Sequence, residues 1–523
     1  MKTVILAACA LALASCGRGA VILTDTVNPT RPTTPVGYPG SSTFAAPSGF
    51  DDFVALGADP TGQVNAEPVL RAWFEGGGSS LFIPAGTYLF TYTSETKNGL
   101  QLARNVRIIG AGEDLVTVTI GPDNPSFAIT MLMLTGACDV KIQGVKFVGP
   151  LMSGMIYYEQ VTTAIVLGLT VNSATPTNVV ADHVRWERLT NPFLFFGGSS
   201  TPTTLMVTNS IGGGYGGLGM YRDYSDTHQV ILQRTTFLYA GVPAAQNPYT
   251  GTNVGTAVYI HGNINYRVEG VLFQDDNATI PHTAFKCGGG QDRLRAVTQQ
   301  VMIDCEFGAK SGPMLLDGWV RASLLRCRFL NADDGTSMVL GGQGMDFIEC
   351  ELYVTGVLFG ANLRYVFEDC SFRKAGLRAA GEGIDIHIRG GETHWASSVS
   401  SPGYILRCDQ NATSKIVVED HDFWSEITAD GGSTPVFLME GGYLRLDRVT
   451  FRGNWRNGAD ASPVVIEHNA NVVGVDLDTC TFDIGAKWAV NVGGPNGKTT
   501  LRTVGTSWGG ARVNDPYGEW AGS

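Results

Sequence analysis

The segment from residue 301 to residue 372 repeats one short pattern four times: VMIDCEF (301–307), LLRCRF (324–329), FIECEL (347–352) and VFEDCSF (366–372). In each copy, alternating apolar residues are followed by a polar residue, a Cys, any residue and a large apolar residue. Alternation with a period of two is typical of a strand that has one buried face. Since the copies end at residues 307, 329, 352 and 372, each predicts one coil of a solenoid.

Seven further copies, with Cys or other residues in the Cys slot, extend the pattern in both directions: VKIQGVKF (140–147), VVADHVRW (179–186), VILQRTTF (230–237), YRVEGVLF (266–273), VVEDHDF (417–423), LRLDRVTF (444–451) and VDLDTCTF (475–482). The longer spacings are expected to hold loops or an extra coil. Coils stack about 4.8 Å apart, so equivalent residues should lie above one another. We therefore expect an internal thiol stack and a neighbouring aromatic stack, formed by Cys305, Cys327, Cys350 and Cys370, and by Phe307, Phe329 and Phe372.

A second strand is predicted before each copy, for example at 256–262, 313–318, 337–342, 356–360, 383–391, 435–442 and 463–469. Each of these strands ends in Gly or Asn, which tight corners favour. Helical periodicity is nearly absent after residue 76. The chain is therefore expected to be all-β, folded as a single-stranded right-handed parallel β-helix with a short N-terminal capping helix.

The expected cap covers residues 50–90. Asn65 can serve as the N-cap of a helix near residues 66–75 that has Glu67 and Pro68 in its first turn. A GADPTG turn (57–62) precedes this helix, and LFIPAGTY (81–88) follows it as a strand. This order resembles the N-terminal part of the pectate-lyase-like superfamily, whose members open a right-handed β-helix in this way. The resemblance implies the fold but no single activity, since the superfamily includes polysaccharide lyases, glycosidases and phage tailspikes.

The chain before the cap falls into two segments. Residues 1–23 are apolar, but their uninterrupted apolar run at 4–14 is too short to cross a bilayer. They have the form of a secretory signal, and the residues up to Cys16 resemble a bacterial lipobox. Because the sequence begins at Met1 with this segment in place, we expect an anchor that stays on the chain, with cleavage and lipidation at Cys16 as the alternative. Residues 24–49, rich in Pro, Thr, Ser and Gly, are expected to form an extended linker.

The folded body is expected to start near Phe50. Residues 50–139 should form the cap and first coils, residues 140–490 the remaining coils, and residues 491–523 a C-terminal cap or tail. The net charge of −12 argues against nonspecific nucleic-acid binding. The ten Cys show no spacing that suggests zinc, and we expect free thiols, no metal and no cofactor. The net charge is compatible with two classes of ligand: neutral sugars, or a polyanion that binds to a local basic patch.

The strongest candidate site is EGIDIHIR at 382–389. Asp385, His387 and Arg389 alternate with Ile residues and should share one outer face. Side by side, these groups suit proton transfer next to an anionic sugar. The candidate catalytic residues are Glu382, Asp385, His387 and Asp317, and the candidate substrate-binding residues are Arg389, Trp395, Trp319 and His261. The alternative interpretation is an ordinary solvated strand face.

The functional hypothesis is a phage tailspike-like virion protein that binds, and in one version depolymerises, cell-surface polysaccharide. The resemblance implies a homotrimer, and the N-terminal segment would attach the protein to other virion proteins. One alternative is an exported, outer-membrane-anchored bacterial lipoprotein that acts as a polysaccharide lyase or glycoside hydrolase. Another is a non-catalytic carbohydrate-binding or structural β-helix. The Asp clusters and the Arg expected for calcium-dependent pectate lyases are not recognisable, which argues against pectate cleavage.

Overall fold

The fold is taken from a computed structural model, which describes the following residues: 37–123, 125–151, 162–167, 177–189, 192–196, 203–214, 218–221, 229–239, 256–261, 265–275, 283–288, 300–308, 314–316, 321–330, 337–340, 344–353, 356–359, 363–373, 376–379, 381–396, 406–409, 413–426, 436–454, 463–467, 472–484, 488–493 and 498–514. Some strand residues within these ranges are described by their backbone alone. Val36–Ser523 form one compact unit.

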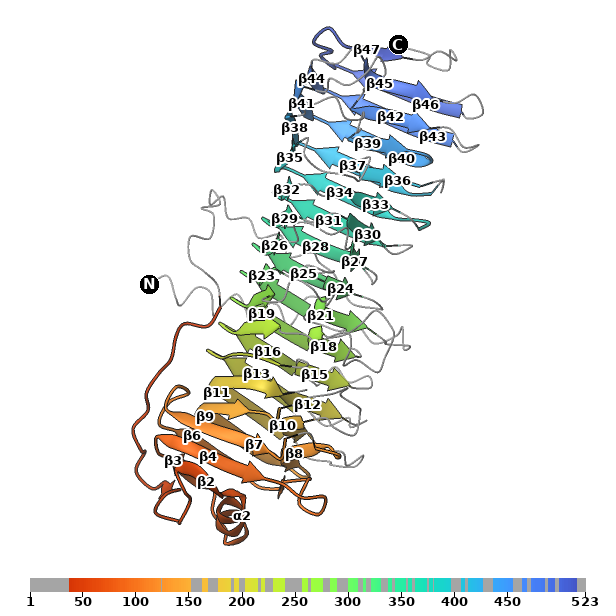
Figure 1. The fold of residues 1–523 in the computed structure, drawn as a ribbon. Coiled ribbons are helices and arrows are strands. Elements are labelled where there is room, and N and C mark those ends of the chain that lie inside the picture. The colour runs from red at the N-terminus through yellow and green to blue at the C-terminus, as the bar shows by residue number, and fades with distance from the viewer. Residues whose placement is uncertain are drawn as a thin grey trace, which may run out of the picture. The chain divides into compact units, whose positions relative to one another are not determined.

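Two sheets in which every pairing is parallel contain the described strands (Figure 1). The 16-stranded sheet consists of β5 (Leu100–Leu102), β8 (Ile129–Leu134), β10 (Thr162–Leu167), β12 (Phe193–Phe196), β15 (Leu218–Tyr221), β18 (Thr256–His261), β21 (Thr283–Gly288), β24 (Met314–Leu316), β27 (Ser337–Leu340), β30 (Gly356–Phe359), β33 (Leu377–Ala379), β36 (Leu406–Cys408), β39 (Phe437–Met439), β42 (Val464–Glu467), β45 (Trp488–Gly493) and β47 (Arg512–Asn514).

The 31-stranded sheet has a bend that separates two groups of strands. In most coils, the chain turns sharply at one residue that lies between a strand of the first group and a strand of the second. We call this residue the corner residue. The strands before the corner are β1 (Asp51–Asp52), β3 (Ser80–Ile83), β6 (Val106–Gly110), β13 (Thr203–Thr208), β16 (Gln229–Gln233), β19 (Asn265–Glu269), β22 (Gln300–Ile303), β25 (Arg321–Leu325), β28 (Gly344–Ile348), β31 (Arg364–Glu368), β34 (Asp385–Arg389), β37 (Lys415–Glu419), β40 (Gly442–Asp447), β43 (Val472–Asp478) and β46 (Lys498–Val504).

The strands after the corner are β2 (Thr61–Asn65), β4 (Gly86–Thr91), β7 (Val116–Gly121), β14 (Ile211–Gly214), β17 (Thr236–Tyr239), β20 (Leu272–Asp275), β23 (Glu306–Phe307), β26 (Arg328–Leu330), β29 (Glu351–Tyr353), β32 (Ser371–Arg373), β35 (Glu392–Ala396), β38 (Asp422–Glu426), β41 (Thr450–Asn454) and β44 (Thr481–Ile484). Two long strands, β9 (Cys138–Val148) and β11 (Thr177–Leu189), pass through the corner.

A coil consists of one strand of the 16-stranded sheet, one strand before the corner and one after it, as in β33, β34 and β35. Each strand pairs in parallel with the equivalent strand of the next coil. The chain therefore winds into a right-handed parallel β-helix, which confirms the predicted fold class.

The predicted columns of buried side chains are present. The four thiols from Cys305 to Cys370 lie in adjacent coils and are at most 1% exposed. In the next column, the rings of Phe307 and Phe329 stack with centroids 4.8 Å apart and 5° from parallel. The register continues from Phe329 through Leu352 to Phe372. One continuous apolar core thus follows from the period-two pattern.

The corner residues adopt left-handed backbone conformations in at least fourteen coils. They are Gly144, His183, Asn209, Arg234, Gly270, Asp304, Arg326, Glu349, Asp369, Gly390, Asp420, Arg448, Thr479 and Gly505. For residues other than Gly, this conformation costs of order 1–3 kcal/mol each. Two of the pairs formed by adjacent corners are bidentate ion pairs: Arg326 donates to Asp304 at 2.7 and 2.9 Å, and Arg448 donates to Asp420 at 2.6 and 2.9 Å.

One strand prediction was wrong. The segment 383–391 was expected among the second strands, but its strand β34 lies in the 31-stranded sheet, between β31 and β37. It is a further copy of the repeat in which Thr393 occupies the aromatic slot, aligned with Phe372 and Phe423. A second unrecognised copy lies in β13 and β14, where Gly212 is aligned with Trp186 and Phe237.

Helix α2 (Glu67–Glu75) lies beside β4 at the N-terminal end of the described coils (Figure 1). Its N-cap is Ala66, so the expectation of Asn65 at that position was off by one residue. Asn65 still accepts a hydrogen bond from the Glu67 N–H at 3.1 Å, and it also accepts one from the Thr91 N–H at 2.9 Å. The Asn65 side chain therefore ties the start of the helix to β4.

The expected linker boundary at residue 50 does not mark the first contact with the body. Residues 37–49, which we call the strap, run alongside the first coils (Figure 1). The Tyr38 N–H donates to Thr236 Oγ1 at 2.8 Å, and the Phe44 N–H donates to the Ala111 carbonyl at 2.9 Å. Coils that are far apart in the sequence thus supply the partners that bind the strap.

The coils also extend past the expected end at residue 490. Strand β46 pairs with β43, and β47 pairs with β45. The ring of Trp508 stacks on Phe482 with centroids 5.4 Å apart, which continues the aromatic column into the last coil. Among the described residues, no helix has both the length and the apolar composition needed to cross a lipid bilayer.

Candidate functional site

Strand β34 presents its polar residues on one outer face. Asp385 and His387 are half-buried and Arg389 is exposed, whereas Ile386 and Ile388 between them point into the core. The alternation in the sequence therefore places the three polar groups as expected. Parallel pairing then adds outward residues from β37 and β40, so the surface spans several coils.

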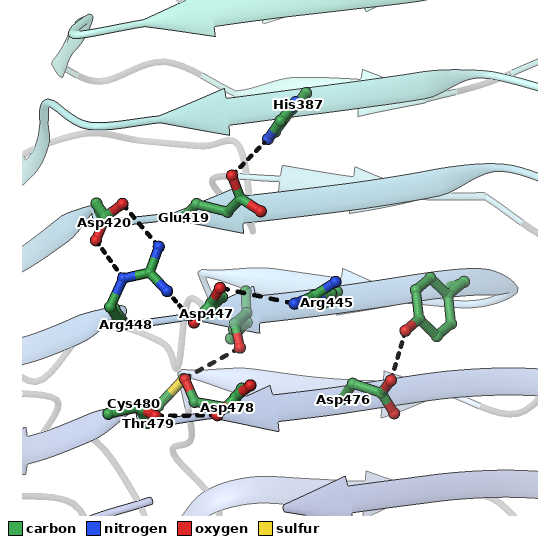
Figure 2. A network of polar contacts seen from close by, with 12 residues as sticks. His387, Glu419, Asp420, Arg445, Asp447, Arg448, Asp476, Asp478, Thr479 and Cys480 are labelled. Carbon is green, nitrogen blue, oxygen red and sulfur yellow. Dashed lines mark hydrogen bonds and ion pairs between the residues drawn. The ribbon is translucent and has the colours of Figure 1, made fainter. Parts of the chain in front are cut away.

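His387 is paired with a carboxylate from the next coil. Its Nε2 lies 3.1 Å from Glu419 Oε2 (Figure 2). Because an ionised carboxylate can only accept, Nε2 carries the proton, and in the neutral imidazole Nδ1 is left as the acceptor. Asp385 lies 3.9 Å from Arg364 Nε, and Glu382 is exposed in the turn before β34.

Val417 lies at the centre of a ring of polar residues on this face, which we call the Val417 ring. It is 8% exposed and lies between His387 and Arg445 of the neighbouring coils. Lys415 and Glu419 flank it on its own strand. The other four members of the ring, at the diagonal positions, are Asp385, Arg389, Tyr443 and Asp447.

Charge-assisted bonds hold carboxylates within this ring and beside it. Arg448 donates to Asp447 at 2.8 Å and forms the bidentate pair with Asp420 (Figure 2). The bond from Arg448, with the nearby charge of Arg389, holds the pKa of Asp420 below its usual range. The Tyr443 hydroxyl donates to Asp476 Oδ2 at 2.5 Å, and burial together with this bond raises the pKa of Tyr443 to about 12.

A second outward row lies just beyond the corner, on β35, β38 and β41. Trp424 is 37% exposed, its ring is 4° from parallel to that of His394 with centroids 6.2 Å apart, and the Arg452 guanidinium lies 5.3 Å from its ring. Glu392 lies 3.2 Å from His394, and Asp422 lies 3.8 Å from Arg452. We call His394, Trp424 and Arg452 the aromatic row.

Trp424 is not among the candidate residues predicted from the sequence, although the sequence contains a signal for it. Trp424 directly follows Phe423, which occupies the inward aromatic slot of its copy. Since successive strand residues alternate between faces, a large ring immediately after that slot must point outward. The contact between Trp424 and His394 could not be predicted from the sequence, because it depends on the register between β35 and β38.

The structure does not bring all the candidate residues together. Trp395 lies in β35 and His261 in β18, and the structure describes both by their backbone alone. Asp317 and Trp319 lie outside the described residues. Strand β18 belongs to the other sheet, so His261 is not on the face formed by β34, β37 and β40. Among the described residues, the candidate binding surface therefore consists of the Val417 ring and the aromatic row.

The charges of the Val417 ring balance, since Arg389, Lys415 and Arg445 face Asp385, Glu419 and Asp447. Both donors and acceptors thus surround the apolar Val417 side chain, an arrangement that suits the hydroxyl groups of a sugar. Within the described part of the chain, no group of three or more His, Cys, Asp or Glu residues is placed to hold a metal ion.

Neither a protein-family model nor a curated protein sequence matches this chain. Among solved structures, it is similar to the Agl-KA catalytic domain (13% identity, TM-score 0.41, 77% of this chain and 69% of that chain). It is also similar to the tailspike of Pseudomonas phage phi297 (9%, 0.35, 87% and 80%) and to a mutant tailspike of E. coli bacteriophage HK620 in complex with pentasaccharide (12%, 0.34, 87% and 84%). The likeness concerns the right-handed parallel β-helix, the class that the sheet topology defines for this chain.

Proposed function

We propose that this protein binds a cell-surface polysaccharide on the outer faces of the coils between β34 and β41. The observation that carries the proposal is the aromatic row. Trp424 is a large ring left exposed and flanked by a parallel imidazole and a guanidinium. Such a ring can stack on the apolar face of a sugar, while the neighbouring carboxylates accept hydrogen bonds from its hydroxyls.

The substitution Trp424→Ala tests this proposal. We expect at least a tenfold loss of affinity, about 1.4 kcal/mol, measured by calorimetry against a panel of neutral and acidic bacterial surface polysaccharides. Leu115→Ala is the matched control, because Leu115 is an exposed apolar residue far from the aromatic row in the sequence. Equal affinity of wild type and Trp424→Ala for every polymer that binds would remove the aromatic row from the proposal.

The balanced charges of the Val417 ring favour a neutral polymer over an acidic one. The chain also has a net charge of −12, which adds long-range repulsion toward polyanions. In the panel, we expect the tightest binding for an uncharged polysaccharide, with an affinity that depends weakly on salt. Tighter binding of an acidic polymer that weakens steeply with salt would contradict this choice.

The setting that we propose is a virion, with the protein acting as a tailspike-like receptor-binding homotrimer attached through its N-terminal segment. Intact mass of the native protein tests the attachment, since a lipidated Cys16 would support the exported lipoprotein instead.

Cleavage of the bound polymer is a second candidate activity, favoured by the His387–Glu419 pair. Release of reducing ends that disappears in His387→Ala would support it.

A further inference from the structure

Between Cys370 and Cys480, the buried columns of the β-helix depart from the pattern of thiols and phenyl rings. In successive coils, the slot after the corner holds Cys305, Cys327, Cys350 and Cys370, and the slot two residues further on holds Phe or Leu. In the next coil, these two slots hold Gly391 and Thr393, and in the coil after that the first slot holds His421. Beyond it, the column returns to Val449 and Cys480.

His421 and Thr393 form a buried polar cluster with the corner residue Gly390. His421 is 1% exposed and Thr393 is 2% exposed. The His421 Nδ1 lies 2.7 Å from the Gly390 carbonyl oxygen, and its Nε2 lies 2.8 Å from Thr393 Oγ1. A carbonyl can only accept, so Nδ1 carries the proton and Nε2 of the neutral ring accepts from the Thr393 hydroxyl.

Burying these polar groups is costly, and the coils on either side fill the same slots with Cys370, Phe372, Val449 and Phe451. The two bonds hold the Gly390 carbonyl and the Thr393 side chain, at the two ends of the segment 390–393. Arg389 directly precedes that segment, and Glu392 and His394 flank Thr393 on the outer face. The interruption therefore lies directly beneath the surface that the proposed function uses, where a departure from the core pattern points to function.

We propose that His421 is a positioning residue, which fixes the outward groups of β34 and β35 for polysaccharide binding through Gly390 and Thr393. This inference rests on the proposed function. The rings of Phe372 and Phe423 also pack against His421. The carboxylates that act on it are those of Asp422 and Glu392.

The test compares His421→Cys, which restores the residue of the thiol column, with His421→Asn, whose amide can still donate to the Gly390 carbonyl. We expect His421→Cys to bind the polymer at least tenfold more weakly than wild type, and His421→Asn to stay within threefold. Val449→Cys, in the same column one coil further on, is the matched control and should bind normally.

Amide hydrogen exchange supplies a readout that needs no ligand. Exchange at residues 390–394 should accelerate at least tenfold in His421→Cys but not in Val449→Cys. Thr393→Val, which removes the other partner, should have the same effect if His421→Cys does not fold. Unchanged exchange at these amides would overturn the inference whether or not a polymer binds. Faster exchange with unchanged affinity would overturn it as well, and a wild type that binds no polymer would instead refute the proposed function.

Discussion

His421 is held uncharged inside the protein. Burial is the largest effect on its imidazole and lowers the pKa from 6.5 to about 4, although the Gly390 carbonyl and the Asp422 and Glu392 carboxylates act in the opposite direction. The unfolded chain therefore binds a proton at a pH where the folded chain does not. Between pH 6.5 and 4, protonation favours the unfolded state, so stability falls as the pH falls.

The free energy of unfolding should therefore decrease by up to about 3 kcal/mol between pH 7 and pH 4 because of this one residue. Urea unfolding at pH 7, 5.5 and 4.5 measures the effect. His421→Cys should show a smaller dependence on pH than wild type. Identical pH dependence of the two proteins would contradict a neutral, buried His421.

At the scale of elements, the strap binds the outside of the first coils through a buried carboxylate. The Tyr38 hydroxyl donates to Glu113 Oε1 at 2.5 Å, the Ser42 N–H donates to the same oxygen at 3.2 Å, and Glu113 is fully buried. The Phe44 ring packs edge-on against His183 at 5.5 Å. An extended segment of Ser, Thr, Pro and Gly is thus fixed by partners from other coils.

Tyr38→Phe should release this strap, because it removes a hydrogen bond to a buried carboxyl group, worth about 1–3 kcal/mol. We expect limited proteolysis within residues 37–49 to accelerate several-fold. Thr43→Ala, at an exposed position of the strap, is the control and should be cleaved at the wild-type rate. Equal rates for all three proteins would show that the Tyr38–Glu113 bond does not hold the strap.

At the scale of the whole molecule, each coil contacts only its neighbours, so the stack should open from its ends. The seven described thiols are buried, and burial raises the pKa of Cys138 and of Cys480 to about 11. Reaction with an alkylating reagent therefore requires opening of a coil. The first coils carry α2 and the strap, whereas Cys480 lies close to the last described coil.

Iodoacetamide labelling, followed by peptide mass spectrometry, should therefore modify Cys480 before Cys327, which lies in the middle of the stack. Cys138 should react more slowly than Cys480, because the strap closes the N-terminal coils. In concentrated urea, the three thiols should react at similar rates. Simultaneous labelling of Cys327 and Cys480 under native conditions would show that the stack opens as one unit.

The sequence by itself determined the coil. Period-two alternation, a fixed slot for Cys and a fixed slot for an aromatic residue are local properties, so they predicted the parallel β-helix, the thiol column and the shared face of Asp385, His387 and Arg389. The same logic failed where a slot held an unexpected residue. Gly212 replaces the aromatic residue because Trp186 fills that space: a Cβ on Gly212 would lie 2.3 Å from Trp186 Cδ2.

Only the tertiary structure decided which residues meet across coils. His387 reaches Glu419 and His394 reaches Trp424, each about 30 residues away, because the register between adjacent coils aligns their strands. That register depends on loop lengths and on how side chains of neighbouring coils fill the shared core. The partners of the strap also come from coils that are distant in the sequence, so the sequence alone did not reveal them. Local pattern therefore fixed the direction of each side chain, whereas stacking decided its neighbours.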